Sequence, residues 1–336
     1  MITSQTIQTI QDIYRLVDAD LKAVDGHISD ILLNAQNSAT TEMCTHLLKA
    51  NGKRIRPVLT LLVARALSDK KTIQNNYQKL IQISSAIELI HMASLVHDDV
   101  IDNSEVRRSQ QSVNVAFGNS KAVTMGVYLY SMSLVQIAEA KSIEALSSLS
   151  AAVKGMCEGE LSQLDTRQEL KFDFDLYTKI ISNKTADLFQ AACYCGAILI
   201  NKETFIGDTV KQFGHQLGIL FQLTDDYLDY FSDGASLKKE VGQDYKDKQV
   251  TLPVLLYASK LDTVEKGLLK NLIEGQTLSF EAFLKRLEDN NIKEESFEYI
   301  SNLKDDCLLQ LEKMDESDYK LALAALVEIV FQRINP

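Results

Sequence analysis

The chain has 336 residues, of which 46% are hydrophobic, so it can bury a large core and is too apolar to be disordered. Its 46 Asp and Glu residues outnumber its 35 Lys and Arg residues, and the net charge of -11 argues against nucleic acid as a partner. A polyanionic substrate would therefore need divalent cations to bridge it to the protein. Only three prolines and 14 glycines interrupt the chain, which favours an all-α fold.

The cysteines and the N-terminus both indicate an intracellular protein. Among five cysteines the one close pair is Cys193-Tyr194-Cys195, so we interpret them as reduced, mostly buried thiols and predict a cytoplasmic location. Met1–Gln5 lacks the basic start and apolar run of a signal peptide. Residues 122–138 are apolar, but Thr, Ser and Gln interrupt them and they fall short of a span of about 20 residues, so we predict an interior helix and no transmembrane segment.

A basic cluster follows the first predicted helix end, at Asn51-Gly52. Lys53, Arg54 and Arg56 lie together before Pro57 in an otherwise acidic chain. Because Arg offers a bidentate fork to phosphate and Lys a point charge, the cluster suits an anion that is not wrapped in metal. A solvated helix end is the alternative interpretation.

Two apolar helical runs end in the same acidic module. Apolar residues recur at helical spacing over residues 80–90, and the run leads to D-D-x-x-D at residues 98–102. A second run over residues 217–228 leads into the same pattern at residues 225–229. This short duplication is the one internal repeat that we detect.

The chemistry of the two modules favours a metal site. The first and last aspartate of each lie four residues apart, so on a helix their Cβ atoms would be about 5–6 Å apart. At about 4 Å and an effective dielectric near 20 their repulsion would reach roughly 4 kcal/mol unless a cation screened it. One module alone could be an acidic helix end, but two modules facing each other would hold Mg2+ ions that grip a diphosphate. The predicted metal ligands, which are also predicted catalytic residues, are Asp98, Asp99, Asp102, Asp225, Asp226 and Asp229.

The rest of the chain adds weaker signals. Arg107-Arg108 follows the first module, and the alternative is that this pair balances the charges of Glu105 and Asp102. From about residue 262 onward, amphipathic segments carry no motif that we associate with chemistry. No linker rich in Pro, Gly or Ser divides the chain. We therefore predict one domain over residues 1–336, with the motifs within about 50–260 and packing helices over 261–336.

Taken together, these motifs resemble those of the trans-isoprenyl (polyprenyl) diphosphate synthase family, and the resemblance covers about two-thirds of the chain. The matching stretches are Gly52-Lys53-Arg54-Ile55-Arg56-Pro57, His91-x-x-Ser94-x-x-His97 with residues 98–102, Arg107-Arg108, Gly159-Glu160-x-x-Gln163, Lys184-Thr185, Phe221-Gln222 with residues 225–229, and Gly242-x-Asp244 leading to Thr251-Leu252-Pro253. The resemblance implies a bacterial medium- or long-chain member. It also implies a single bundle of long antiparallel helices around a deep central cavity, usually as a homodimer.

By this resemblance, the enzyme would condense isopentenyl diphosphate with an allylic diphosphate, using Mg2+ on the six aspartates. The allylic C–O bond would ionise, the isopentenyl double bond would attack the cation, and a proton would leave. The residues implied for isopentenyl diphosphate are Lys53, Arg56, His91 and Arg108. Those implied for the allylic diphosphate are Arg107, Lys184, Thr185, Gln222 and Lys239, with Lys184 also counted as catalytic.

Four positions depart from the family's pattern. The family usually has glycine at Asn51, Gly-x-Pro-Thr at residues 109–112, aspartate at Val127, and Gly-Lys at Lys248-Gln249. The last change removes a lysine expected on the allylic diphosphate, for which Lys248 is the candidate substitute. These differences indicate a divergent member and leave a heteromeric partner open.

Product length is predicted from two small residues. Ser94 and Ala93 lie four and five residues before Asp98, about 6–7.5 Å deeper along a helix. In the resembling family, bulky aromatic residues at this level stop elongation early, so we predict an all-trans product longer than C20. The alternative is that Ala93 only packs against a neighbouring helix.

Other functions remain open at this stage. The chain could be a subunit of a heteromeric prenyl diphosphate synthase with weak activity alone, although such subunits are expected to lose the metal aspartates. His97-Asp98 with His91 also suits a helical metal-dependent phosphohydrolase, which leaves the second module unexplained. A terpene cyclase would not need the basic site for a second diphosphate.

Overall fold

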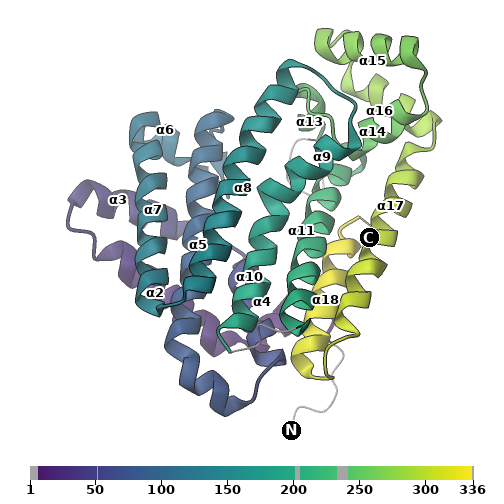
Figure 1. Cartoon of the computed structure of the whole chain (residues 1–336). Helices are drawn as coiled ribbons and strands as arrows, with labels where there is room; N and C mark the ends of the chain where they lie inside the picture. The colour runs from purple at the N-terminus through teal and green to yellow at the C-terminus, as the bar shows by residue number, and fades with distance from the viewer. Residues whose placement is uncertain (1–6, 51, 201–204, 233–240, 335–336) are drawn as a thin grey trace. The chain divides into compact units, whose positions relative to one another are not determined.

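The computed structural model describes residues 7–50, 52–200, 205–232 and 241–334, and nearly all of their regular structure is helical (Figure 1). The strands in these ranges are one short antiparallel pair, β1 (Val106–Arg107) and β2 (Gln110–Gln111). The all-α prediction is therefore confirmed.

The chain divides into two compact units, and each is described by itself. The first comprises Met1–Val153, Ala191–Lys211 and Met314–Leu323. The second comprises Lys154–Gln190, Gln212–Lys313 and Ala324–Pro336. The interpretation of residues 1–336 as one domain stays a prediction.

Whole helices of the first unit are α1 (Ile10–Leu16), α2 (Asp18–Leu33), α3 (Ser38–Lys49), α4 (Ile55–Ala66), α5 (Lys70–Ile101), α6 (Val113–Phe117) and α7 (Asn119–Ala140). Whole helices of the second are α9 (Phe174–Ile181), a π-helical turn η1 (Ser182–Ala186), α13 (Gln243–Lys246), α14 (Leu252–Ser259), α15 (Thr263–Gly275), α16 (Phe280–Asp289) and α17 (Ile292–Leu311). The helices shared between the units are α8 (Ile143–Gln168), α10 (Asp187–Ile198), α11 (Phe205–Phe231) and α18 (Asp318–Gln332).

The core of the first unit is built around α5. The side chain of Asp69 caps its first turn by accepting a hydrogen bond of 2.7 Å from the backbone N–H of Thr72. Every residue from Leu80 to Ile90 is buried, because α5 packs against α7, α4 and α2. By length and composition α5 could cross a membrane, but 78% of its apolar window is buried inside the protein, as in a core helix.

Helices α5 and α7 approach closely beside the first acidic module. A Cβ atom on Gly126 would lie 2.1 Å from Nε2 of His97, so only glycine leaves room for the imidazole at this crossing. The same Nε2 lies 3.1 Å from the carbonyl oxygen of Val123. The contact fixes the helix end on which the module begins.

Helix α7 corrects one prediction. Residues 122–138 form a helix as expected, but only one face is buried. The other face exposes apolar side chains, among them Val123, Val127 and Leu134, which are 47%, 56% and 52% exposed. The sequence alone could not separate a helix buried all round from one with a second apolar face.

The second unit has its own aromatic core. Helices α14 and α16 pack against α17, and Tyr245 stacks on Phe283 with ring centroids 4.8 Å apart. Helix α11 approaches η1 closely, since a Cβ atom on Gly218 would lie 2.5 Å from the Cα atom of Ala186. This core supports the helix that carries the second acidic module.

Candidate active site

The basic loop of the first unit links α3 to α4. Lys53 is exposed and Arg56 lies in the first turn of α4. Burial lowers the pKa of Arg56 to about 10, with Arg108 adding to the effect and Glu88 opposing it. The guanidinium still carries its charge at neutral pH, in a setting that disfavours the charge and therefore favours binding of an anion.

His91 and Arg108 belong to the same region of the first unit. Burial, and then the positive charges of Arg56 and Arg108, hold the pKa of His91 well below its usual 6.5. The imidazole is therefore neutral at pH 7. Arg108 Nη1 donates to the carbonyl of Ala50 at 3.2 Å, which brings this arginine to the basic loop. The four residues predicted for isopentenyl diphosphate thus share one unit.

The first acidic module lies at the C-terminal end of α5. Asp98 is half-buried, Asp99 is 3% exposed, and Asp102 is exposed at the helix cap. Arg107 donates to Oδ1 of Asp99 from Nε, at 2.9 Å, and from Nη2. Arg107 therefore pairs with the buried aspartate of the module, a partner that the charge-balance alternative did not name.

A pocket of the first unit is lined by both charged and apolar side chains. Its charged groups are three arginines, Arg54, Arg107 and Arg108, and one carboxylate, Asp99, with which Arg107 is paired. Apolar residues of α5, such as Met92, line another part of the wall. The combination suits an anionic head group attached to an apolar body.

The second acidic module lies near the C-terminal end of α11. Asp226 is 5% exposed and accepts hydrogen bonds from Tyr177 Oη, at 2.5 Å, and from Gln222 Nε2, at 2.9 Å. Asp225 forms an ion pair with Arg333. Asp229 accepts from the backbone N–H of Asp244, at 2.8 Å.

The electrostatics of this module suit a hard cation. Burial raises the pKa of Asp226 to about 7; hydrogen bonds from Tyr177 and Gln222 oppose the shift, and the charges of Asp225 and Asp229 add to it. Burial, and then the charge of Asp226, also holds the pKa of Asp244 well above its usual value. A cation would relieve this repulsion with the carboxylate ligands that hard metals prefer.

The aspartates would bind a divalent metal together with oxygen atoms of the substrate. Within the described ranges, no group of three or more His, Cys, Asp or Glu side chains is already arranged to hold a metal ion. Mg2+ is typically bound through one or two carboxylates together with substrate phosphate oxygens and water, and does not need an all-protein cage. The aspartates present therefore fit a metal that arrives with a diphosphate. The meeting of the two modules stays a prediction.

Lys184 and Thr185 lie in the π-helical turn η1, a local irregularity frequent at functional sites. Lys184 Nζ forms an ion pair with Glu160 and donates to Oε1 of Gln163. Thr185 Oγ1 donates to Oε1 of Gln222 at 2.9 Å. A Cβ atom on Gly159 would lie 2.9 Å from Cγ of Lys184, so this glycine makes room for the lysine.

Other predicted residues have mixed outcomes. Lys239 and Asn51 lie outside the described residues. Ala93 is fully buried on α5, whereas Ser94 is half-buried and donates to the carbonyl of His91 at 2.9 Å. Lys248 Nζ donates to the carbonyl of Glu274 at 2.7 Å, so the C-terminal part of α15 already engages this candidate substitute.

Sequence analysis did not include several residues that contact the predicted site among the metal or substrate ligands. These residues are Arg54, Glu88, Glu160, Tyr177, Asp244 and Arg333. Glu88 gave a signal, because it is an acid inside an apolar helical run. Arg333 corrects the interpretation of residues 261–336 as packing helices alone, since it contacts Asp225 from the C-terminal segment.

Comparisons with known proteins agree on one family. The family described as polyprenyl synthetase matches residues 37–288. Octaprenyl diphosphate synthase of Escherichia coli is 31% identical over 96% of this chain and 99% of its own length. Heptaprenyl diphosphate synthase component 2 of Geobacillus stearothermophilus is 35% identical over 73% of this chain and 75% of its own length.

Solved structures give the same result. The structure of a decaprenyl diphosphate synthase from Rhodobacter capsulatus has a TM-score of 0.89 and 28% identity, and the match covers 97% of this chain and 99% of that chain. A polyprenyl synthase from Caulobacter crescentus, complexed with calcium and isoprenyl diphosphate, has a TM-score of 0.86 and 27% identity. The match covers 98% of this chain and 99% of that chain. This chain therefore belongs to the polyprenyl synthetase family.

Proposed function

We propose that this protein condenses isopentenyl diphosphate with an allylic diphosphate and releases an all-trans polyprenyl diphosphate longer than C20. The observation that carries the proposal is that the family match spans the basic loop and both acidic modules. The named products of the relatives, octaprenyl, heptaprenyl and decaprenyl diphosphate, support the length. A phosphohydrolase would leave the second module and the basic loop without a purpose.

The reaction breaks the bond between C1 and oxygen of the allylic diphosphate and forms a carbon–carbon bond with the isopentenyl double bond. Lys53, Arg56 and Arg108 would hold the isopentenyl diphosphate. Lys184, Thr185 and Gln222 would orient the allylic diphosphate. The departing diphosphate would accept the proton that the new chain loses, so no side-chain base is required.

Divalent metal would be held by Asp98, Asp99, Asp102, Asp225, Asp226 and Asp229, and we propose Mg2+. When bound, it neutralises the negative charge that grows on the leaving group. The calcium in the Caulobacter relative supports a divalent cation, and an oxygen-only ligand set supports a hard one.

We propose a homodimer in the cytoplasm. The apolar face of α7 supports self-association, because residues 122–138 contain no charged side chain. The five cysteines, all within the described ranges, form no disulfide, and four of them are buried, as is common in a reducing compartment. The similarity to one component of a heptaprenyl synthase keeps a heteromeric assembly as the alternative.

The test is product analysis with the purified chain. Incubation with isopentenyl diphosphate, allylic primers and Mg2+ should give products longer than C20 by mass spectrometry, and removing the metal with a chelator should stop the reaction. Asp98→Ala and Asp225→Ala should each lower kcat by on the order of 10³-fold, because each removes a charge that acts at the leaving group.

Asp69→Ala is the matched control. Asp69 caps the opposite end of α5, so its loss should cost about 1 kcal/mol of stability and leave kcat unchanged. Full activity in Asp98→Ala or Asp225→Ala would contradict the site assignment. Release of phosphate from nucleotides without prenyl transfer would contradict the proposed reaction.

A further inference from the structure

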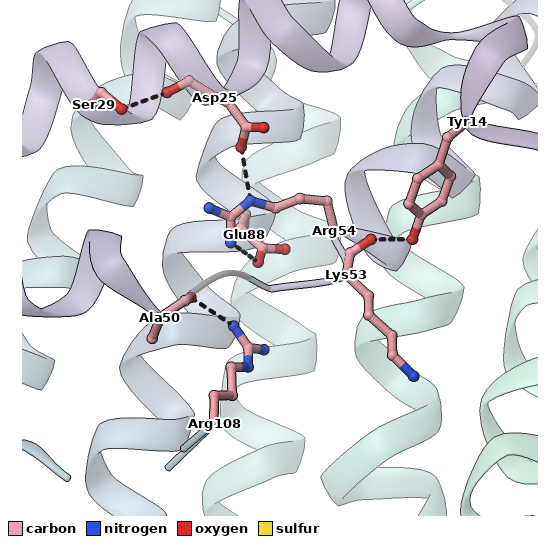
Figure 2. A network of polar contacts seen from close by, with 8 residues as sticks. All are labelled: Tyr14, Asp25, Ser29, Ala50, Lys53, Arg54, Glu88 and Arg108. Atoms are coloured by element: carbon pink, nitrogen blue, oxygen red, sulfur yellow. Dashed lines mark hydrogen bonds and ion pairs between the residues drawn. The ribbon is translucent and has the colours of Figure 1, made fainter. Parts of the chain in front are cut away.

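Sequence analysis included Arg54 in the basic cluster but assigned no substrate to it, and its side chain turns into the protein. Its Nε donates to Oδ1 of Asp25 at 2.8 Å, and its Nη1 donates to Oε1 of Glu88 at 2.9 Å (Figure 2). The side chain is only 12% exposed. Arg54 is therefore held between two carboxylates and is mostly buried, whereas Lys53 is exposed.

Glu88 is an unusual residue for its position. Its side chain is 2% exposed, on a stretch of α5 in which Leu80 to Ile90 are all buried. An apolar side chain of similar volume would pack there without the desolvation cost of a carboxylate. Glu88 also lies three residues before His91, on the same face of the helix. The buried charge thus connects the core helix to the basic loop at the level of the predicted isopentenyl site.

The backbone of the loop is held in a conformation that needs support. Arg54 has φ 50° and ψ 30°, in the left-handed region that side chains other than that of glycine disfavour, at the N-cap of α4. The hydroxyl of Tyr14 donates to the carbonyl of Lys53, the residue just before it. Burial and the charge of Glu88 raise the pKa of Tyr14 to about 12, so the hydroxyl remains a donor.

Two guanidinium groups flank the start of the loop. A Cβ atom on Gly52 would lie 2.5 Å from Nη1 of Arg108 and 2.8 Å from Nη1 of Arg54, so the glycine backbone lies against both groups. Arg108 is attached to the preceding chain through the carbonyl of Ala50. Figure 2 shows the ammonium group of Lys53 pointing away from the guanidinium of Arg54. The side chains of Lys53 and Arg54 therefore point in different directions, and only that of Arg54 points toward Glu88.

We propose that Arg54, Glu88 and Tyr14 are positioning residues, which fix the loop backbone so that Lys53 and Arg56 meet the diphosphate of the isopentenyl substrate. The inference rests on the proposed function and adds to it a buried support behind the binding residues. A loop ordered in advance loses less conformational freedom when the ligand binds, so the support acts on affinity for this one substrate. The allylic substrate, predicted to bind through other residues, should not depend on it.

The test separates binding from folding with two variants. Glu88→Gln keeps the shape and removes the charge, and should raise KM for isopentenyl diphosphate by at least about tenfold, as expected for a lost charge-assisted hydrogen bond. Tyr14→Phe keeps the ring and should raise KM for isopentenyl diphosphate about fivefold, as expected for the loss of one neutral hydrogen bond. KM for the allylic diphosphate should stay within about twofold in both, since only one loop is affected. Calorimetric titration with isopentenyl diphosphate, without metal, should show the same losses of affinity.

Asp20→Asn is the matched control, because it breaks another buried ion pair of α4. Asp20 accepts from Nε and Nη2 of Arg65 at 2.5 and 2.8 Å, near the opposite end of that helix. This variant should lower the melting temperature without changing either KM. Glu88→Asp, which keeps the charge, should recover part of the affinity lost in Glu88→Gln.

The outcomes distinguish the two claims. If the wild type is active and both Glu88→Gln and Tyr14→Phe keep its KM for isopentenyl diphosphate, the inference is overturned and the proposed function stands. The inference is also overturned if Glu88→Gln raises the KM values for both substrates equally and Asp20→Asn, at a similar loss of melting temperature, does the same. Glu88 would then have only a structural role. A wild-type protein that neither binds isopentenyl diphosphate nor transfers prenyl groups would remove the proposed function and the inference together.

Discussion

Single residues in the first unit show how local conformation affects stability. Ser109 has φ 64° and directly follows Arg108, which has φ 51°. Glycine adopts this left-handed region without the steric cost, of about 1 kcal/mol, that a Cβ atom brings. We expect Ser109→Gly to raise the free energy of unfolding by about 0.5–1 kcal/mol, measured by denaturant titration. Its control is Ser150→Gly, an exposed position inside α8, where glycine should lower stability by about 0.5 kcal/mol. A loss of stability in Ser109→Gly would contradict the argument.

His91 provides a pH prediction at the same scale. Burial, with Arg56, Arg108, Arg107 and Arg54 nearby, holds its pKa well below the 6.5 of an unfolded chain. Between these two pKa values the unfolded state binds more protons, so stability is fully present above pH 6.5 and is lost as the pH falls toward the folded pKa. Between pH 7.5 and 5.5, His91→Asn should lose about 1 kcal/mol less stability than the wild type. Equal losses in denaturant titrations at the two pH values would show that His91 does not titrate in this way.

At the scale of elements, helix positions could be predicted because apolar periodicity is a local property. The runs over residues 80–90 and 217–228 were predicted to be helical and lie in α5 and α11, and each acidic module lies near the end of its helix. The sequence also predicted a helix end near residues 51–52, and α3 ends just before it, at Lys49. These features need only residues that are neighbours along the chain.

The residues that support the modules could not be predicted in this way. Tyr177 is 49 residues from Asp226, and Arg333 is 108 residues from Asp225, so the contacts depend on tertiary packing. Nothing in the local pattern around Arg333 separates it from a surface arginine. Glu88, which contacts the basic loop and not a module, was also missed, although it carried a local signal, since a carboxylate in an apolar run requires a buried partner.

Helix α5 also carries the prediction of product length. If Ala93 faces the growing chain, Ala93→Phe should shorten the product while the enzyme stays folded. Ala86→Phe lies two turns further from Asp98, about 10 Å along the axis, and should give a product of intermediate length. If Ala93 only packs against a neighbouring helix, Phe would overpack it and cost about 1–3 kcal/mol without changing the product. Product mass and thermal denaturation, measured on the same samples, decide between these outcomes.

At the scale of the whole molecule, the exposed face of α7 raises the question of assembly. Val123, Val127 and Leu134 recur at helical spacing on a 22-residue helix, which is about 33 Å long. Val127 stands where the resembling family usually has aspartate, so this chain has lost a charge from an exposed site. Residues 122–138 of this helix carry no charge, and an exposed apolar face of this kind is rare on monomers and suits an interface between two copies.

The proposed homodimer makes a measurable prediction. Light scattering after gel filtration should give twice the chain mass of 37.6 kDa for the wild type. Leu134→Lys would bury a charge without a partner and should shift the protein toward the monomer. Val264→Lys is the control, because Val264 is 72% exposed on α15 and lies outside this face, and it should leave the mass unchanged. A wild-type chain that is monomeric and inactive alone would contradict the homodimer and would favour the alternative, in which the exposed face of α7 binds a different subunit.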